Sequence, residues 1–503
     1  MSPYAVPAIV LITVATVGIG AFGYRISRNT SDFLVASRTV SPRWNASAIS
    51  GEYLSAASFL GVAGLVMTNG VDMLWYPVGF TAGYLAMLLY VAAPLRRSGA
   101  YTLPDFAEAR LRSRSLRGLA TGFVVLIGWL YLVPQLQGAG LTLSTVTGAP
   151  PWLGAVVVGA VVTLNVAVGG MRSITFVQAF QYWVKLTAIA LPAMVLVLVW
   201  RYRDGSAGEL TGPRLGGDVW AVPLTGLPGE HPLFATYSLI LATFLGTMGL
   251  PHVLVRFYTN PDGRAARTTT LVVLGMLGVF YLFPPLYGAL GRIYVPRLLE
   301  EGRTDAVVLV LPGAAVGGLG GQLLTGLVAA GAFAAFLSTS SGLLVSVSGV
   351  LSTDVLGRWS SRHGSVRDFR RSAMVAGLVP LLLALQVGKL GLSQVVGLAF
   401  AVAASTFCPL LVLGIWWRGL TAVGAGAGLV VGGSLSGTAV LLTVLGPELS
   451  GWPRALLAQP AAWTVPTAFA VMVLVSLATS RRVPPDIGRT MLQLHAPESL
   501  RLR

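Results

Sequence analysis

The sequence predicts an all-α integral membrane protein with about 13 transmembrane helices. Hydrophobic residues make up 54% of its 503 positions and charged residues only 10%, whereas soluble domains carry about 25% charge. Apolar runs of about 20 residues, long enough to cross a hydrocarbon layer about 30 Å thick, recur along nearly the whole chain. The runs are continuous and do not alternate with polar residues as barrel strands do, so the pattern favours helices over the strands of a membrane β-barrel.

Thirteen apolar runs are predicted to be membrane spans. We interpret the first run as a helix and not as a signal peptide, because no basic segment precedes it and no small-residue cleavage pattern follows it. The predicted spans are 6–25, 46–69, 72–94, 118–141, 151–169, 174–200, 234–255, 270–291, 318–352, 373–388, 391–416, 420–446 and 460–480.

The net charge of +16 is typical of nucleic-acid binding in a soluble protein, but here the basic residues follow the membrane topology. With the N-terminus outside and thirteen spans, 25 of the 34 Lys and Arg residues fall in inner segments, eight fall in outer ones, and Lys185 lies within a span. This bias obeys the positive-inside rule. We therefore expect membrane lipid as a partner, no nucleic acid, an outer N-terminus and a cytoplasmic C-terminus. The Arg-, Ala- and Gly-rich composition favours a bacterial cytoplasmic (inner) membrane.

Two predicted spans contain residues that interrupt a helix. Ser50–Ser55 brings a glycine, hydroxyl residues and an acid into an apolar run, and Gly246–His252 contains two glycines and a proline, which weaken or remove helical hydrogen bonds. Broken helices of this kind form the binding sites of transporters with inverted repeats. Because the two spans are five apart, each would open a five-helix unit of opposite orientation. Gly and Pro are also common in ordinary membrane helices.

A single transmembrane domain is predicted for residues 1–503. The two five-helix repeats, 46–200 and 234–416, form its core. The other segments are an extra N-terminal helix with an inner loop at 1–45, two additional helices at 420–480 and a cytoplasmic tail at 481–503.

Small hydroxyl residues cluster in the predicted span 318–352. Ala335, Ser338 and Thr339 share one helix face by the i, i+3, i+4 rule. A hard cation such as sodium prefers oxygen ligands, and hydroxyl and carbonyl oxygens would supply them without a permanent charge. Serine and threonine in membrane helices also bond to their own backbone or to a neighbouring helix, so the cluster alone leaves both interpretations open.

Four strings of the sequence resemble the sodium:solute symporter family, and in particular its acetate and short monocarboxylate permease branch. The resemblance runs in order from about the first span to the eleventh. The strings are GEYLSAASFLG at 51–61, YTLPDF at 101–106, GGMR at 169–172 followed by VQ at 177–178, and GTMGLPHVLVRFYT at 246–259.

The resemblance implies a leucine-transporter type of fold with two inverted five-helix repeats, and sodium-coupled symport of a small monocarboxylate such as acetate, propionate or pyruvate. It also implies a sodium ion as the coupling cofactor, with no organic cofactor. Matched by motif, the family's shared sodium site falls on carbonyls and hydroxyls of five residues. These are Gly51, Leu54, Ala335, Ser338 and Thr339.

Two ionisable residues, Glu52 and Lys185, are predicted to lie inside spans, where a charge costs at least about 2.5–3.5 kcal/mol. Lys185 could have a functional role, extend its ammonium group toward the membrane surface (snorkel), or form a structural ion pair. Glu52 could accept hydrogen bonds that stabilise the broken helix, or carry a proton and make transport proton-coupled. We do not expect these two residues to pair with each other. His252 and Arg256 approach the inner end of their span, which favours a gating or topological role.

An anionic substrate would be held by donors that carry no full charge, such as hydroxyls and amides. The candidates are Tyr53, Gln135, Gln137 and Thr247, and each could instead bond one helix to another. Two departures from the family pattern are Gln178, where some members place an acid that helps ion release, and Glu52, where the branch often has Asp.

Other functional classes make different demands on the sequence. An intramembrane enzyme would need converging carboxylates, a metal cluster or a nucleophile with a base, and the four histidines lie on different predicted elements, so we do not expect an enzyme. The alternatives that remain are a sodium- or proton-coupled symporter of another small solute, such as an amino acid or a sugar, a passive channel, or a transport-like sensor.

Overall fold

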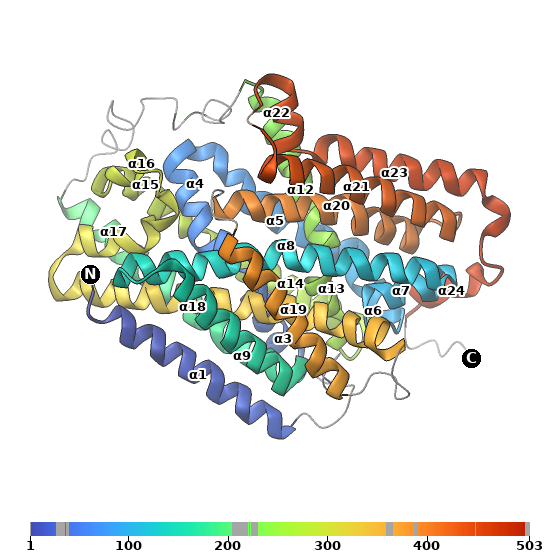
Figure 1. The fold of residues 1–503 in the computed structure, drawn as a ribbon, viewed down its shortest axis with the longest axis horizontal. Coiled ribbons are helices and arrows are strands. Elements are labelled where there is room, and N and C mark those ends of the chain that lie inside the picture. The colour runs from blue at the N-terminus through green and yellow to red at the C-terminus, as the bar shows by residue number, and fades with distance from the viewer. Residues whose placement is uncertain are drawn as a thin grey trace.

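The computed structural model describes residues 2–26, 36, 40–203, 220, 222, 230–358, 366–386, 391–447 and 449–497. Every regular element within these ranges is helical, which confirms the predicted all-α class. Long helices run along the longest axis of the molecule, with α7, α6 and α24 gathered at one end and α15, α16 and α17 at the other (Figure 1). Some of the Lys and Arg residues that were assigned to inner or outer segments lie outside the described ranges. They are Arg28, Arg38, Arg214, Arg362, Lys389, Arg501 and Arg503.

The helices of the first half of the chain are bounded as follows: α1 Ala5–Ile26, α3 Pro42–Tyr53, η2 Ala57–Gly61, α4 Val62–Asn69, η3 Gly70–Leu74, α5 Trp75–Ala86, η4 Met87–Val91, α6 Ala92–Arg97, α7 Leu103–Leu111, α8 Arg114–Thr147, α9 Pro151–Arg203, α12 Pro232–Gly249 and α13 Pro251–Val255. Those of the second half are η6 Phe257–Thr259, α14 Gly263–Tyr281, α15 Pro284–Tyr294, α16 Arg297–Glu300, η7 Thr304–Ala306, α17 Val307–Val316, α18 Gly318–Val350, η8 Leu351–Val355, η9 Leu356–Arg358, α19 Val366–Gln386, α20 Leu392–Trp416, α21 Ala422–Leu445, α22 Gly451–Ala458, α23 Ala461–Ala478, η10 Ser480–Arg482 and α24 Ile487–His495.

Each of the thirteen predicted spans corresponds to helical structure, but the divisions between them differ. Ten helical stretches within the described residues are long and apolar enough to cross a membrane. Two of these stretches, Ala57–Arg97 and Pro151–Arg203, each join two predicted spans, and α19 is not among the ten. The second stretch bends at Gly170, whose φ of 58° lies in the region that favours glycine. The parts before and after Gly170 are therefore two helices with different directions.

The structure adds helices that the apolar runs do not reveal. The ten-residue α17 is apolar but contains Pro312 and is too short to read as a span. Short polar helices also form at the ends of the bundle. One of them, α7, begins with a capping box, in which Thr102 accepts from the backbone N–H of Asp105 and Asp105 accepts from that of Thr102.

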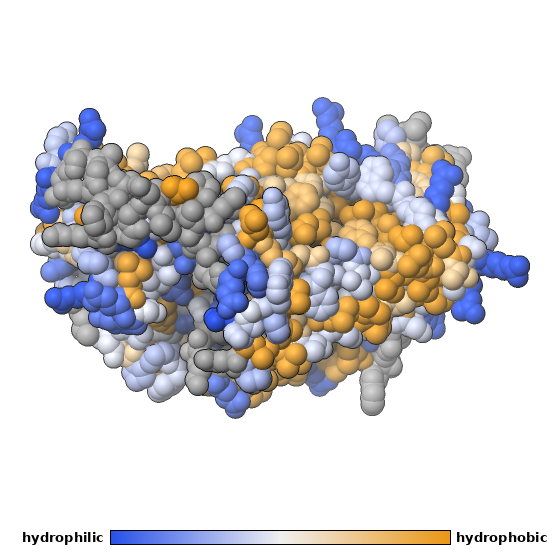
Figure 2. All heavy atoms as spheres, turned by 90° about the horizontal axis from the view of Figure 1, so that it is seen from above, coloured by the Kyte–Doolittle hydropathy of each residue, from blue (hydrophilic) through white to orange (hydrophobic). Residues whose placement is uncertain are grey.

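Burial separates inner helices from those that face lipid. The 18 most apolar consecutive residues of the stretch that contains α18 are all buried. In α1 and α23, only 28% and 33% of the corresponding residues are buried. Apolar side chains such as Leu11, Leu445 and Leu474 are exposed. On the face shown in Figure 2, hydrophobic residues cover the middle of the molecule and hydrophilic residues gather toward its ends, as expected for a protein surrounded by acyl chains.

Candidate functional site: a cation cage between two interrupted helices

The first helical interruption lies where the sequence predicts it. Helix α3 ends at Tyr53, Leu54 leaves the helical region with φ −72° and ψ 86°, and the chain resumes as the π-helical turn η2. Gly51 sits directly against the carbonyl oxygen of Gln178 on α9, and a Cβ at this position would collide with it. The glycine therefore allows the end of α3 to approach α9 closely, so the carbonyls freed by the interruption face that helix.

The second interruption falls between α12 and α13. Leu250 is extended, with φ −72° and ψ 115°, and Pro251 begins the next helix. Proline suits this position because its missing N–H is not needed in the first turn of a helix. The predicted interruption at Gly246–His252 is thereby confirmed, at the single residue Leu250.

The structure brings the five predicted cation ligands together. The Ser338 hydroxyl lies 2.7 Å from the Gly51 carbonyl oxygen and 3.0 Å from that of Ala335. The Thr339 hydroxyl donates to the Glu52 carbonyl at 2.5 Å. Ser338 and Thr339 are completely buried. The end of α3 and the middle of α18 thus form a small cage of carbonyl and hydroxyl oxygens, to which Leu54 contributes a further carbonyl.

A side chain of the protein occupies this cage. Lys185 of α9 directs its ammonium group at the carbonyl oxygens of Gly51 and Leu54 and at the hydroxyl of Ser338, with Nζ 2.8 Å from Leu54 O and 2.6 Å from Ser338 Oγ. The lysine is fully buried and does not snorkel. The oxygens have the chemistry that sodium requires, but in this arrangement they bind an ammonium instead.

A buried ion pair lies beside the cage. Arg256 Nε donates to Glu52 Oε2 at 2.6 Å, and both side chains are at most 1% exposed. Arg256 also donates to Thr175 Oγ1 at 2.8 Å and to Gln178 Oε1. Gln178 in turn donates to the Ser338 carbonyl at 2.7 Å. One continuous network therefore connects α3, α9, α18 and the end of α13.

The network gives two of its residues contacts that the sequence does not show. The sequence places Arg256 among the inner basic residues and near the end of its span, but the residue is completely buried and neutralises Glu52. The sequence treats Gln178 only as the loss of an acid, but its amide accepts from Arg256 and donates to the helix that carries Ser338. Glu52 pairs with Arg256, whereas the Lys185 ammonium contacts carbonyl and hydroxyl oxygens.

The predicted substrate residues form direct contacts near the interruptions. The Tyr53 hydroxyl lies 2.8 Å from the Thr247 hydroxyl. Because Thr247 donates its own hydrogen to the Thr243 carbonyl, Tyr53 is the donor in this pair. Gln135 accepts from the backbone N–H of Ala56 at 2.9 Å and so caps the restart of the first broken helix. Gln137 follows two positions later, about 200° round the helix, and is half-buried.

Two buried side chains near these residues have polar atoms without a hydrogen-bond partner in the described part of the chain. They are the Tyr84 hydroxyl and both ring nitrogens of His252; Glu52 Oε1, Ser55 Oγ and Ser340 Oγ in the same region also have no hydrogen-bond partner among the described residues. Tyr84 packs edge-to-face on Tyr53 with ring centroids 4.7 Å apart, and His252 packs on Tyr131 at 5.3 Å. His252 is therefore buried beside the interruption, in the last part of its span. No sequence pattern singles out Tyr84 or Tyr131.

Aromatic rings separate this region from the predicted outer side. A cavity of about 590 Å³ opens among the ends of α4, α12 and α22, with Tyr76 in its lining. Phe80 contacts Tyr76 at 6.0 Å and Tyr53 at 5.8 Å between ring centroids. On the predicted inner side, the corresponding hollow around Thr102 measures only about 10 Å³. Of these two hollows, the larger therefore lies on the predicted outer side.

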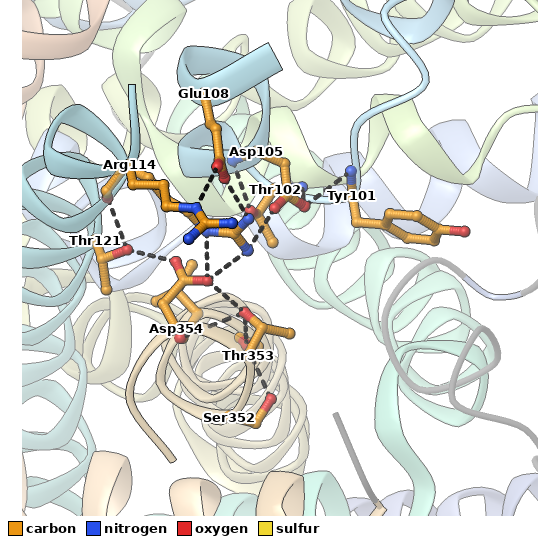
Figure 3. Close-up of polar contacts among 12 residues, drawn as sticks. Tyr101, Thr102, Asp105, Glu108, Arg114, Thr121, Ser352, Thr353 and Asp354 are labelled. Atoms are coloured by element: carbon orange, nitrogen blue, oxygen red, sulfur yellow. Dashed lines mark hydrogen bonds and ion pairs between the residues drawn. The ribbon is translucent and has the colours of Figure 1, made fainter. Parts of the chain in front are cut away.

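An ion-pair cluster ties helices together on the predicted inner side. Asp105, Glu108 and Asp354 each form an ion pair with the guanidinium of Arg117, at distances of 2.5–2.7 Å. Figure 3 shows these three carboxylates gathered in one polar cluster. Burial raises the pKa of the Asp105 carboxyl, and the positive charge of Arg117 acts in the opposite direction. The cluster explains part of the YTLPDF string, because its aspartate both caps α7 and binds the start of α8.

Comparisons with known proteins show the family to which the chain is related. The sequence model described as "Sodium:solute symporter family" matches residues 33–432. The uncharacterized symporter YwcA of Bacillus subtilis is 32% identical over 456 residues, which cover 88% of this chain and 87% of YwcA.

Solved structures share the fold. A substrate-bound, outward-open Na⁺-coupled sialic acid symporter has a TM-score of 0.71 at 17% identity, over 94% of this chain and 98% of that one. The nucleobase-cation-symport-1 family transporter Mhp1 has a TM-score of 0.56 at 16% identity, over 93% and 99% of the two chains. The predicted leucine-transporter type of fold is confirmed, and the bounds of its two repeats remain a prediction.

Proposed function

Because the chain belongs to the sodium:solute symporter family and is thus a membrane transporter, we propose that it carries a small monocarboxylate together with sodium by alternating access. Acetate, propionate and pyruvate are the solutes of the proposed class. The proposal includes a bacterial cytoplasmic membrane, with the N-terminus outside and the C-terminus inside, on the basis of the distribution of basic residues.

The observation that carries the proposed substrate is the pair of unpartnered buried groups beside the interruptions. The Tyr84 hydroxyl and the His252 ring offer polar atoms that bind nothing else in the described residues. A carboxylate would accept hydrogen bonds from such donors, and the surrounding rings of Tyr53, Tyr131 and Phe400 suit a short alkyl group. Arg256 is not available to the substrate because it is engaged by Glu52.

A sugar fits these surroundings less well. Each hydroxyl of a sugar needs a polar partner when it is buried, yet Tyr53, Thr247 and Gln135 already bond within the protein. Sodium coupling is also favoured over proton coupling. The acid that could carry a proton, Glu52, is already bound to Arg256.

The test is uptake into proteoliposomes under an inward sodium gradient. Labelled pyruvate, acetate and propionate should accumulate above equilibrium, while proline and glucose should not. A potassium gradient of the same size should give no accumulation, and a sodium ionophore should abolish it. Equilibration without accumulation would indicate a channel. Accumulation driven by an acid outer pH without sodium would show that protons, not sodium, are the coupling ion. Accumulation of proline or glucose would show that the solute is not restricted to a monocarboxylate.

A further inference from the structure

The ammonium group of Lys185 has as many acceptors as it has hydrogens. Its three N–H donors meet the carbonyls of Gly51 and Leu54 and the hydroxyl of Ser338. A charge buried at this depth is tolerated only when it is fully hydrogen-bonded or paired. The contacts fulfil that condition without an acid, because the nearest carboxylate, Glu52, is bound to Arg256.

The three acceptors belong to the set of oxygens that the family resemblance assigns to sodium. Ser338 Oγ and Leu54 O lie 2.6 and 2.8 Å from Nζ, so the ammonium fills the space between them. A second cation bound to the same oxygens would lie within a few ångströms of the ammonium, where two like charges repel strongly in a region of low dielectric constant. One cage therefore accepts one cation.

We propose that Lys185 is a tethered competitor for the sodium position, so that its ammonium group and a sodium ion occupy the cage in turn and never together. The inference rests on the proposed sodium coupling and adds to it a residue that sets how tightly sodium binds. Without an ion, the carbonyls freed by the interruption of α3 would lack partners. The ammonium supplies that partner, and the flexible four-carbon stem of lysine allows it to withdraw when sodium enters.

The first test measures binding of radioactive sodium to purified protein in detergent, in the absence of any carboxylate. Lys185→Met keeps the length of the side chain and removes its charge. This variant should bind sodium at least tenfold more tightly than the wild-type protein. Addition of Ser338→Ala to Lys185→Met should remove the gain, which places the ion in the cage. Equal affinity of wild type and Lys185→Met, or a gain that survives Ser338→Ala, would overturn the proposal.

The second test keeps Lys185 in place. The chain has only two lysines, Lys185 and Lys389, so Lys389→Arg leaves Lys185 as the single lysine amine of the full-length protein. Sodium should increase the rate of reductive methylation of Lys185 several-fold relative to potassium, because the displaced ammonium is no longer held by three acceptors. The same rate in both salts would contradict mutual exclusion.

Neither test requires transport. Sodium binding that depends on Lys185 with no accumulation of any carboxylate would refute the proposed substrate and leave this inference standing. Sodium-driven pyruvate uptake with the same sodium affinity in wild type and Lys185→Met would do the reverse.

Discussion

Glu52 and Arg256 form an ion pair across the two interrupted helices, with 2.6 Å between Nε and Oε2. Glu52 stands two residues before Leu54, and Arg256 directly follows α13. The pair joins the end of one broken helix to the end of the other, 204 positions away in the sequence. A movement that separates α3 from α13 must therefore break it.

Replacement of Arg256 by Met should destabilise the protein strongly. The change leaves the Glu52 carboxylate buried without its partner, and loss of one member of a buried ion pair typically costs about 3–5 kcal/mol. The melting temperature in detergent should fall clearly. Arg264→Met is the matched control, because Arg264 is exposed on α14. The double variant Glu52→Gln with Arg256→Met should recover part of the lost stability. Equal melting temperatures for Arg256→Met and Arg264→Met would refute a stabilising ion pair.

Replacement of both Ser338 and Thr339 by Ala should abolish sodium-stimulated uptake while the protein remains in the membrane. Both hydroxyls face the broken end of α3, and alanine offers no oxygen. Ser341→Ala is the control, since Ser341 is buried on the same helix but donates to its own backbone at Leu337. Unchanged sodium dependence in the double variant would exclude these hydroxyls as sodium ligands.

Gly51→Ala should impair both folding and transport. The new methyl group would meet the Gln178 carbonyl, and overpacking of this kind costs about 1–3 kcal/mol. The backbone must shift to relieve the contact, which would also move the carbonyl that Lys185 binds. Gly278→Ala on α14 has open space around its added Cβ and should behave as wild type. Thermal stability and sodium binding of the two variants can be compared directly.

Tyr84→Phe and His252→Phe should weaken carboxylate transport and leave stability intact. Neither residue's free polar atoms bond to another described residue, so their removal breaks no hydrogen bond of the protein. A hydrogen bond to a charged group contributes about 1.5–3 kcal/mol, and its loss should raise the KM for pyruvate about tenfold or more. The exposed Tyr90 provides the control variant Tyr90→Phe. An unchanged KM would remove both residues from the substrate site.

Local composition was sufficient to locate the long apolar helices and the two interruptions, but not the short helices such as α7 and α17. The strings around Gly51 and Pro251 predict breaks because glycine and proline act on the backbone where they stand. The grouping of Ala335, Ser338 and Thr339 also follows from helix geometry alone. The division between the predicted spans 151–169 and 174–200 also contains Gly170, the residue at which the structure bends.

Pairings between distant residues could not be predicted in the same way. Glu52 and Lys185 are the charges visible inside spans, but the partner of Glu52 stands where a span ends, and only the direction of the short α13 brings Arg256 inward. The contacts of Lys185 are with backbone carbonyls, and a carbonyl leaves no trace in residue identity. Tyr84 and Tyr131 look like ordinary aromatic residues of a membrane helix until their neighbours are known.

The full burial of the central part of α18 has a consequence for the influence of the bilayer. A helical segment with no lipid-facing side cannot respond directly to acyl-chain length or saturation, so the cage in this part of α18 is insulated from the composition of the membrane. Changes of lipid act first on the peripheral helices α1 and α23, in which only 28% and 33% of the 18 most apolar residues are buried. The thickness of the bilayer should accordingly alter how fast the transporter moves between its states more than how tightly the cage holds its cation.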